Sequence, residues 1–270
     1  MTEEQKHISF SELKEWVKCP FSHKLMYVDG MKHFRGNEYT AFGTAIHNTC
    51  EKILVEKKQN NNHNIDEKKL FEIYFKEEVE GLEDIKVNQK MVNDMKDQGK
   101  ELASLVYSKL SKYFKEYEFV SAEEMLYVPI KEYTKGEYNF KGYIDLVLKT
   151  KDGKYHIIDW KSCSWGWDAR RKADTMTTYQ LTLYKHYFAL KHNIKPEKIE
   201  TYFALLKRTA KKNKIEMVKV RNGSRKMQNA VNLLKTGLYN IDKQNYLKKK
   251  TSCQRCEFYQ TDECPRGKTW

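Results

Sequence analysis

The sequence predicts an α/β protein in which a mixed central β-sheet of about five strands is flanked by helices. Over residues 1–118, apolar residues recur every three to four positions, as on one face of a helix. From Phe119 onward β-branched and aromatic residues alternate with polar ones, as in strands. A further helical pattern between the third and fourth strands indicates a crossover within a mixed sheet. We expect a single domain over residues 1–270, with a mainly helical lobe (1–118), a core (119–240) and a cysteine-bearing tail (241–270).

The first helix is expected to begin at Ser9 and to end at Pro20. Ser9 and Glu12 have capping-box spacing, and proline cannot continue a helix. The other predicted helices are Ala41–Lys57, Ile65–Leu82, Gln89–Tyr117, Thr175–His192 and Ser224–Tyr239. Their periodicity places these side chains inward: Phe42, Ile46, Ile53, Met91, Met95, Leu102, Val106 and Tyr113. In the helix Thr175–His192 it places Leu183, Tyr187 and Leu190 on one side.

Five strands are expected in the second half of the chain. Lys135-Gly136 and Asp152-Gly153 have the composition of hairpin turns and separate the first three. The predicted strands are Glu124–Tyr133, Tyr138–Lys149, Tyr155–Lys161, Ile199–Lys207 and Ile215–Arg221.

The charge of the chain is concentrated in its second half. The net charge of +13 arises from 50 Lys and Arg against 37 Asp and Glu, and residues 121–270 hold 31 of the basic and 16 of the acidic residues. Such a surface indicates a polyanionic partner, the alternative being a solvated lysine-rich surface. No apolar stretch reaches the roughly 18 to 20 residues of a membrane span, and MTEEQKHISF lacks the layout of a signal peptide. We therefore expect a cytoplasmic protein without a membrane partner.

Two aspartates and a lysine are expected to meet across a hairpin. Asp145 lies in one predicted strand, whereas Asp159 and Lys161 end the next and share one face. Paired carboxylates repel each other, and Mg²⁺ or Mn²⁺ would remove that repulsion. The lysine could then orient or deprotonate a water whose pKa the metal lowers. The alternative is a set of ordinary ion pairs at strand ends.

The segments GYIDLV and IIDWKS, with Gln180 and Tyr184 spaced as Q-x-x-x-Y and His47 upstream in FGTAIHNTCEKI, resemble the PD-(D/E)XK nuclease superfamily, and within it the RecB-type branch. The resemblance covers about His7–Tyr187 and implies a restriction-endonuclease-like core. The roles it implies are metal binding by His47, Asp145, Asp159 and the Trp160 carbonyl, catalysis by Lys161, and positioning of the active site and DNA by Gln180 and Tyr184. The first acidic position of the family falls on Glu123 or Glu124, and the sequence leaves both open.

Four cysteines form a second signature. Cys253-x-x-Cys256 and Cys264-Pro265 lie in the tail, and Cys19-Pro20 lies near the other end of the chain. Four thiolates can hold Zn²⁺ or a [4Fe-4S] cluster, and spacing does not choose between them. The arrangement is similar to that of RecB-type iron-sulfur nucleases, including CRISPR-associated four-cysteine exonucleases, which implies a [4Fe-4S] cluster joining the termini, with structural Zn²⁺ as the alternative. Cys50 is expected in the core and Cys163 near the site.

Two basic segments are candidates for DNA contact. The loop SCSWGWDARRK combines aromatic faces with cationic groups, which suits single-stranded DNA, although the tryptophans could instead cover the end of the sheet. The turn KRTAKKNK is the second candidate, with a solvated hairpin tip as its alternative. The candidate residues are Trp165, Trp167, Arg170, Arg171, Lys172, Lys207 and Arg208.

These inferences predict a metal-dependent DNA exonuclease acting on single-stranded ends or overhangs. Its setting would be DNA repair, recombination, phage replication or CRISPR adaptation, with a helicase, recombination protein or CRISPR integrase as partner. The alternative is a catalytically silent DNA-binding subunit of a larger nuclease-helicase or CRISPR integration complex.

Overall fold

The computed structural model describes residues 6–32, 34–82 and 86–265, and the chain divides into two compact units. The central unit consists of Gly36–Leu126 and Tyr143–Asn222, and the terminal unit of Met1–Arg35, Tyr127–Gly142 and Gly223–Trp270. Two predicted segments lie partly outside the described residues: residues 1–5 of the start that was expected to lack a signal peptide, and residues 266–270 of the cysteine-bearing tail. The expectation of a single domain stays a prediction.

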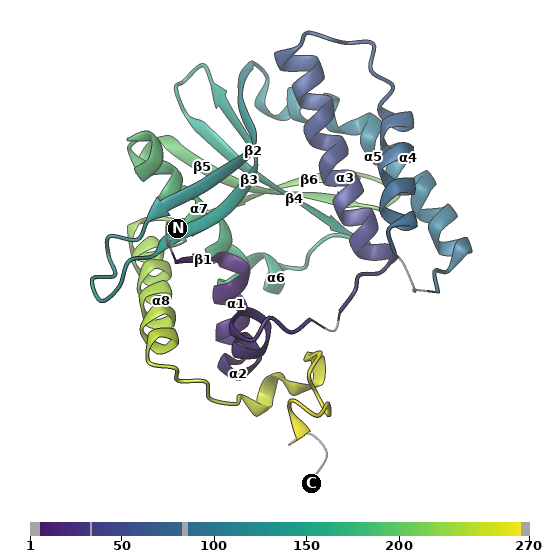
Figure 1. Ribbon diagram of the computed structural model, residues 1–270. Coiled ribbons are helices and arrows are strands. Elements are labelled where there is room, and N and C mark those ends of the chain that lie inside the picture. The colour runs from purple at the N-terminus through teal and green to yellow at the C-terminus, as the bar shows by residue number, and fades with distance from the viewer. Residues whose placement is uncertain (1–5, 33, 83–85, 266–270) are drawn as a thin grey trace, which may run out of the picture. The chain divides into compact units, whose positions relative to one another are not determined.

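A six-stranded mixed sheet flanked by helices confirms the predicted fold class (Figure 1). The strands follow the order β1-β3-β4-β5-β6, and β2 also pairs with β3. Two differences from the predicted strands stand out: β2 begins earlier than expected, and the short β1 was not predicted because three residues carry no recognisable alternation. The strands are β1 (His7–Ser9), β2 (Tyr117–Pro129), β3 (Asn139–Thr150), β4 (Tyr155–Cys163), β5 (Ile199–Lys207) and β6 (Ile215–Val220).

The predicted crossover joins β4 to β5. These two strands are parallel, with Asp159 opposite Phe203 and Lys161 opposite Leu205. The connection contains α6 (Ala169–Ala173), α7 (Thr175–His192) and the short helix η3 (Pro196–Lys198). The β3/β4 and β5/β6 pairs are antiparallel. The crossover therefore places the end of β4, with its acidic and basic residues, in the middle of the sheet.

Three helices of the central unit pack together, as Figure 1 shows for α3, α4 and α5. Their buried side chains form one core with residues of β3, β4 and β5, including Trp160. Gly99 permits close packing of α5 on α4, because a Cβ there would lie 2.0 Å from the ring of Phe71. Tyr113, predicted to face inward, is 45% exposed. The helices are α3 (Glu38–Leu54), η2 (Val55–Gln59), α4 (Glu67–Glu80) and α5 (Gln89–Phe114).

Helix α7 packs on the other side of the strands. Strand alternation turns Ile158 and Trp160 toward the α3–α5 core, and so turns Asp159 toward α7. Of the three α7 residues predicted to share one side, Leu183 and Tyr187 are fully buried, whereas Leu190, near the end of the helix, is 49% exposed. The core thus supports the strand from one side while α7 faces its charged residues.

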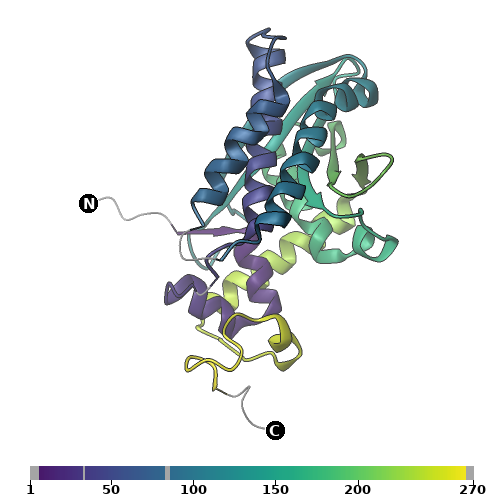
Figure 2. The ribbon, with the colours of Figure 1, turned by 90° about the vertical axis from the view of Figure 1, so that its right-hand side faces the viewer.

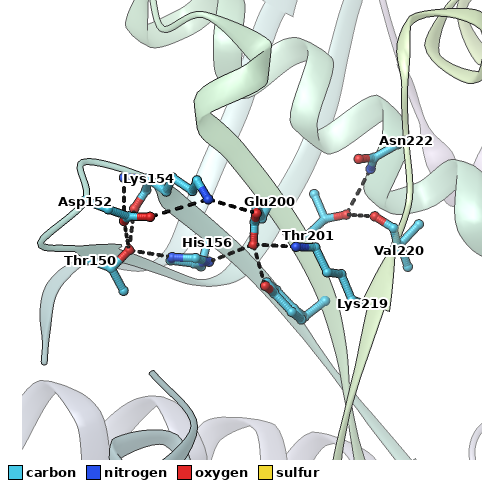
Figure 3. A network of polar contacts seen from close by, with 10 residues as sticks. Thr150, Asp152, Lys154, His156, Glu200, Thr201, Lys219, Val220 and Asn222 are labelled. Atoms are coloured by element: carbon cyan, nitrogen blue, oxygen red, sulfur yellow. Dashed lines mark hydrogen bonds and ion pairs between the residues drawn. The ribbon is translucent and has the colours of Figure 1, made fainter. Parts of the chain in front are cut away.

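A polar network fixes the register of β4 and β5 at the hairpin end of β4 (Figure 3). Glu200 accepts a hydrogen bond from Tyr202 at 2.6 Å and pairs with Lys219 at 2.8 Å and Lys154 at 3.5 Å. Thr150 lies 2.8 Å from Nε2 of the buried His156. The network lies at the opposite end of β4 from Lys161, so it anchors the strand without entering the candidate site.

The terminal unit brings the first helices, α1 and α2, beside the tail, as Figures 1 and 2 both show. Ser9 caps α1, as predicted, by accepting a hydrogen bond from the Glu12 N–H. Phe21 N–H donates to the carbonyl of Leu247 at 3.3 Å, and Ser252 Oγ donates to the carbonyl of Lys18. The helices are α1 (Phe10–Lys18), α2 (Pro20–His23), η1 (Lys24–Val28), α8 (Ser224–Asp242) and η4 (Lys250–Arg255).

No helix in the described part of the chain combines the length and the hydrophobicity that a membrane span requires.

Candidate active site

Two aspartates on neighbouring strands, one buried and one partly buried, form the centre of the candidate site. Asp145 comes from β3 and Asp159 from β4, and Asp159 is 2% exposed. Burial raises the pKa of both carboxyls, and the charge of Asp159 raises the pKa of Asp145 further. Two negative charges confined in this way are costly unless cations or hydrogen-bond donors balance them.

Lys161 and Gln180 supply part of that balance. Lys161 Nζ lies 2.6 Å from Asp159 Oδ2, and Gln180 Nε2 donates to Asp159 Oδ1 at 2.7 Å. Burial lowers the pKa of Lys161, but the charges of Asp159 and Asp145 outweigh burial and raise it above its usual value. The hydroxyl of Tyr184 lies 3.5 Å from Gln180 Nε2, one helical turn further along α7. The structure thus brings together the residues predicted from β4 and α7.

His47 reaches Asp145 from α3. Its Nδ1 lies 3.7 Å from Asp145 Oδ2, which also accepts a hydrogen bond from the Trp160 N–H at 2.7 Å. Burial and the positive charge of Lys161 lower the pKa of His47 to about 4, although a hydrogen bond with the backbone of Trp160 opposes them. The imidazole is therefore neutral near pH 7, the form that binds metal ions. Asn37 positions the helix by capping it in a capping box with Thr40.

The structure distinguishes the two candidate glutamates. Glu124 is held by Ser121, Lys191 and His192, with its carboxylate 2.8 Å from Lys191 Nζ. Glu123 has a left-handed backbone (φ +46°), an uncommon conformation for a non-glycine residue that is frequent at functional sites. Burial raises its pKa, as do the nearby charges of Glu51 and Asp159. Of the two glutamates, Glu123 is therefore the one whose pKa the charge of Asp159 raises.

Sequence reasoning missed Glu51 as a member of this group. Burial raises the pKa of Glu51, and its charge acts on Glu123. Its position four residues after His47 on α3 could have revealed it, because residues at that spacing share a helix face.

The donor set fits a hard divalent cation. Carboxylate oxygens and a neutral imidazole are suitable ligands for Mg²⁺ or Mn²⁺, and the raised pKa values of Asp145 and Asp159 reflect negative charge that a cation would stabilise. Within residues 6–32, 34–82 and 86–265, no three His, Cys, Asp or Glu side chains already converge closely enough to hold a metal ion. Lys161 is the cation that contacts Asp159 in this arrangement.

The predicted DNA-contact residues have different environments. Trp165 is 76% exposed, whereas Trp167 is buried, with its ring centroid 5.0 Å from that of Phe203. Arg170 and Arg171 are exposed on α6, and the Arg171 guanidinium lies 4.7 Å from the Trp167 ring.

The remaining basic candidates are engaged within the central unit. Lys172 and Lys207 both bind Glu216, at 2.5 Å and 3.1 Å. Arg208 is buried and donates to Gln98 and Ser164. The prediction that all these residues contact DNA remains untested, but the structure gives Lys172, Lys207 and Arg208 internal partners.

The four predicted cluster cysteines line one cavity in the terminal unit. The Lys249 N–H donates to Cys19 Sγ at 3.4 Å, and Cys256 Sγ lies 3.7 Å from Ser22 Oγ. Burial raises the pKa of Cys253, and the charges of the other three thiols raise it further. All four are unoxidised thiols: Cys19, Cys253, Cys256 and Cys264. Cys50, by contrast, is buried in the core of the central unit, as predicted.

Comparison with known proteins identifies the family. The chain matches the PD-(D/E)XK nuclease superfamily over residues 7–261. No curated protein matches it. Among solved structures, the one described as "Crystal structure of SSO0001" is similar over 96% of each chain, with 15% sequence identity and a TM-score of 0.40. The match to the superfamily spans nearly the whole chain. In this chain Lys161 contacts Asp159, and Asp145 lies on the adjacent strand. The chain belongs to the PD-(D/E)XK nuclease superfamily.

Proposed function

We propose that the protein is a metal-dependent DNA exonuclease that hydrolyses phosphodiester bonds at single-stranded ends or overhangs. Membership of a nuclease superfamily supports hydrolase activity. The observation that carries the proposal is the contact of Lys161 with the buried Asp159, beside the partly buried Asp145 on the adjacent strand. The basic second half of the chain supports a DNA substrate.

The proposed metal ligands are Asp145, Asp159, His47 and the carbonyl of Trp160. A bound Mg²⁺ or Mn²⁺ would lower the pKa of a coordinated water and offset negative charge on the phosphate. Gln180 orients Asp159 through its hydrogen bond, and Tyr184 supports Gln180 from the next turn of α7.

Lys161 has the proposed role of a charged donor. Its raised pKa keeps the ammonium protonated near neutral pH, so it donates hydrogen bonds and stabilises negative charge. Of the two roles that the sequence left open for Lys161, a protonated ammonium favours orienting the attacking water over deprotonating it. Glu123 is the proposed first acidic residue, because Glu124 is bound by Lys191 and His192.

The test compares cleavage of end-labelled linear and closed circular single-stranded DNA in Mn²⁺ or Mg²⁺. We expect degradation of linear DNA only, and loss of cleavage by at least about 100-fold in Lys161→Ala. Cleavage of circles would make the protein an endonuclease with the same chemistry. Tight DNA binding without cleavage would favour a silent subunit of a nuclease-helicase or CRISPR integration complex.

The cellular setting is part of the proposal: DNA repair, recombination, phage replication or CRISPR adaptation, with a helicase, recombination protein or CRISPR integrase as partner. Gene neighbourhood discriminates among these settings. An adjacent integrase gene would support CRISPR adaptation, and an adjacent helicase gene would support recombination.

We also propose that the four thiols hold a [4Fe-4S] cluster. What supports this proposal is that all four thiols line one cavity, although binding would have to draw them closer together, and that the Lys249 N–H is bonded to Cys19 Sγ, as is typical of groups that stabilise ligating thiolates. Protein purified without oxygen should be brown and contain iron. A colourless protein with stoichiometric zinc would instead establish the structural Zn²⁺ alternative.

A further inference from the structure

The loop between β4 and α6 exposes one tryptophan and buries the other. Trp167 is buried and contacts both Phe203 and the guanidinium of Arg171, so it is part of the folded scaffold. Trp165 is 76% exposed and is the most exposed aromatic side chain in the described part of the chain. Its indole makes no ring contact or hydrogen bond with any described residue. An indole held in water in this way needs an explanation, because tryptophan usually buries most of its surface.

Hydrogen bonds hold the backbone before Trp165, and a closely packed glycine follows it. The Ser164 carbonyl accepts hydrogen bonds from the N–H and the hydroxyl of Thr209, at 3.0 Å and 2.9 Å. Gly166 has a φ of +118°, and a Cβ there would lie 2.9 Å from Lys207 Cδ. Because the backbone next to Trp165 is constrained, a ligand stacking on its indole would meet a preorganised surface. The loop would then lose little conformational entropy on binding.

The loop is connected to the candidate active site through one aromatic ring. Phe203 contacts Trp167 and lies 5.9 Å from Lys161 Nζ, measured to the ring centroid. Trp165 itself follows Lys161 by four residues. The rigid loop therefore continues directly from the strand that carries the proposed catalytic lysine.

We propose that Trp165 stacks on an unpaired base and thereby gives the protein its preference for single-stranded DNA, an inference that rests on the proposed function. Arg170 and Arg171 are exposed on the adjoining helix and form no ion pair with any described residue, and Arg170, which unlike Arg171 makes no contact with an aromatic ring there, is the arginine available to a phosphate. An unpaired base offers its face to an indole, whereas the bases of a duplex are already stacked. Stacking also tolerates any base.

Binding is measured in the Lys161→Ala background with EDTA, so that the result does not depend on cleavage. Fluorescence anisotropy with a labelled oligo-dT strand and a blunt duplex gives both affinities. Trp165→Ala should weaken binding of the single strand about 10-fold and leave the duplex unchanged, because one stacked base contributes about 1 to 3 kcal/mol. Trp165→Phe, the matched control, should retain most of the affinity.

The salt dependence separates stacking from phosphate contact. Trp165→Ala should keep the slope of log affinity against log salt, whereas Arg170→Ala should reduce it by about one phosphate contact. Unchanged single-strand affinity in Trp165→Ala, or an equal loss for strand and duplex, would overturn the stacking proposal. Loss of single-strand affinity in Trp165→Ala, together with no metal-dependent cleavage by the protein that retains Lys161, would support stacking and reject the nuclease function.

Discussion

At the scale of single residues, the charge of Asp145 is expected to lower the stability of the metal-free protein while allowing it to bind a metal ion. Its raised pKa means that the folded protein favours the protonated carboxyl, so stability falls as pH rises above the ordinary carboxyl range. Asp145→Asn removes this charge and can keep the hydrogen bond from the Trp160 N–H. We expect the metal-free variant to be more stable at pH 8 by about 1 kcal/mol, and to lose the stabilisation that Mn²⁺ gives the wild type.

Thermal unfolding in EDTA and in Mn²⁺, at pH 5 and pH 8, checks this expectation. The advantage of Asp145→Asn in EDTA should be larger at pH 8. An equal Mn²⁺-induced shift in variant and wild type would show that Asp145 does not hold the metal.

Glu123 and Glu124 are adjacent but should have separable effects. Glu123→Gln is expected to reduce cleavage about 10- to 100-fold with little change in stability, because Glu123 faces the charge of Asp159. Glu124→Gln should lower the free energy of unfolding by about 1 kcal/mol and leave cleavage near wild type, because its carboxylate binds Lys191 and His192. Cleavage assays and urea unfolding of both variants check these two expectations. Loss of cleavage in Glu124→Gln with wild-type cleavage in Glu123→Gln would assign the acidic role to Glu124.

At the scale of elements, the packing of α5 on α4 depends on the missing side chain of Gly99. Gly99→Ala would place a Cβ 2.0 Å from the Phe71 ring, which is itself fully buried and cannot move without disturbing the core. We expect a loss of about 3 kcal/mol in urea unfolding. Gly81→Ala is the matched control, because its Cβ would meet nothing closer than 3.5 Å and the change should stay within about 0.5 kcal/mol.

The β4/β5 pair should carry a pH-dependent stability through Glu200. Burial raises the pKa of Glu200, but hydrogen bonds from Lys219 and Tyr202 outweigh it and hold the pKa at about 2. A lowered pKa stabilises the fold above the ordinary glutamate range, and this stabilisation is lost as pH falls toward 2. Glu200→Gln should therefore cost about 2 to 3 kcal/mol at pH 7.

Unfolding free energies at several pH values test this assignment. The wild type and Glu200→Gln should converge as pH falls from about 4.5 to 2. The exposed Glu118→Gln serves as control and should track the wild type. A constant difference between Glu200→Gln and wild type at all pH values would mean that packing, and not ionisation, is responsible.

At the scale of the whole molecule, the four cysteines connect segments that are far apart in sequence. Cys19 and the three tail cysteines belong to one unit, so a shared cluster would restrain the tail against the first helices. Cys19→Ser should reduce bound iron and make the chain after α8 sensitive to protease. Cys163→Ser, which lies outside the cavity, should change neither.

Limited proteolysis followed by mass spectrometry, with iron analysis of the same samples, checks this prediction. Cleavage near Lys243–Lys250 should appear in Cys19→Ser and in chelator-treated wild type. Equal protection of the tail in all samples would show that the thiols do not restrain it.

The sequence by itself determined much of the local structure and the composition of the site. Periodicity placed α7 and β5 at their observed bounds, since long amphipathic or alternating patterns are strong local signals. Motif spacing brought Asp145, Asp159, Lys161 and Gln180 into one hypothesis, and the structure places them in contact or on adjacent strands. It could not predict β1, which is too short to show a pattern.

Only the tertiary structure decided which environment each of several equivalent residues has. Glu123 and Glu124 are indistinguishable in sequence, but a left-handed backbone at one and ion pairs at the other separate them. Trp165 and Trp167 likewise differ because Phe203, from a strand distant in sequence, covers one and leaves the other in water. The physical reason is common to both cases: local sequence determines periodicity and charge, whereas burial and pairing depend on segments that only folding brings together.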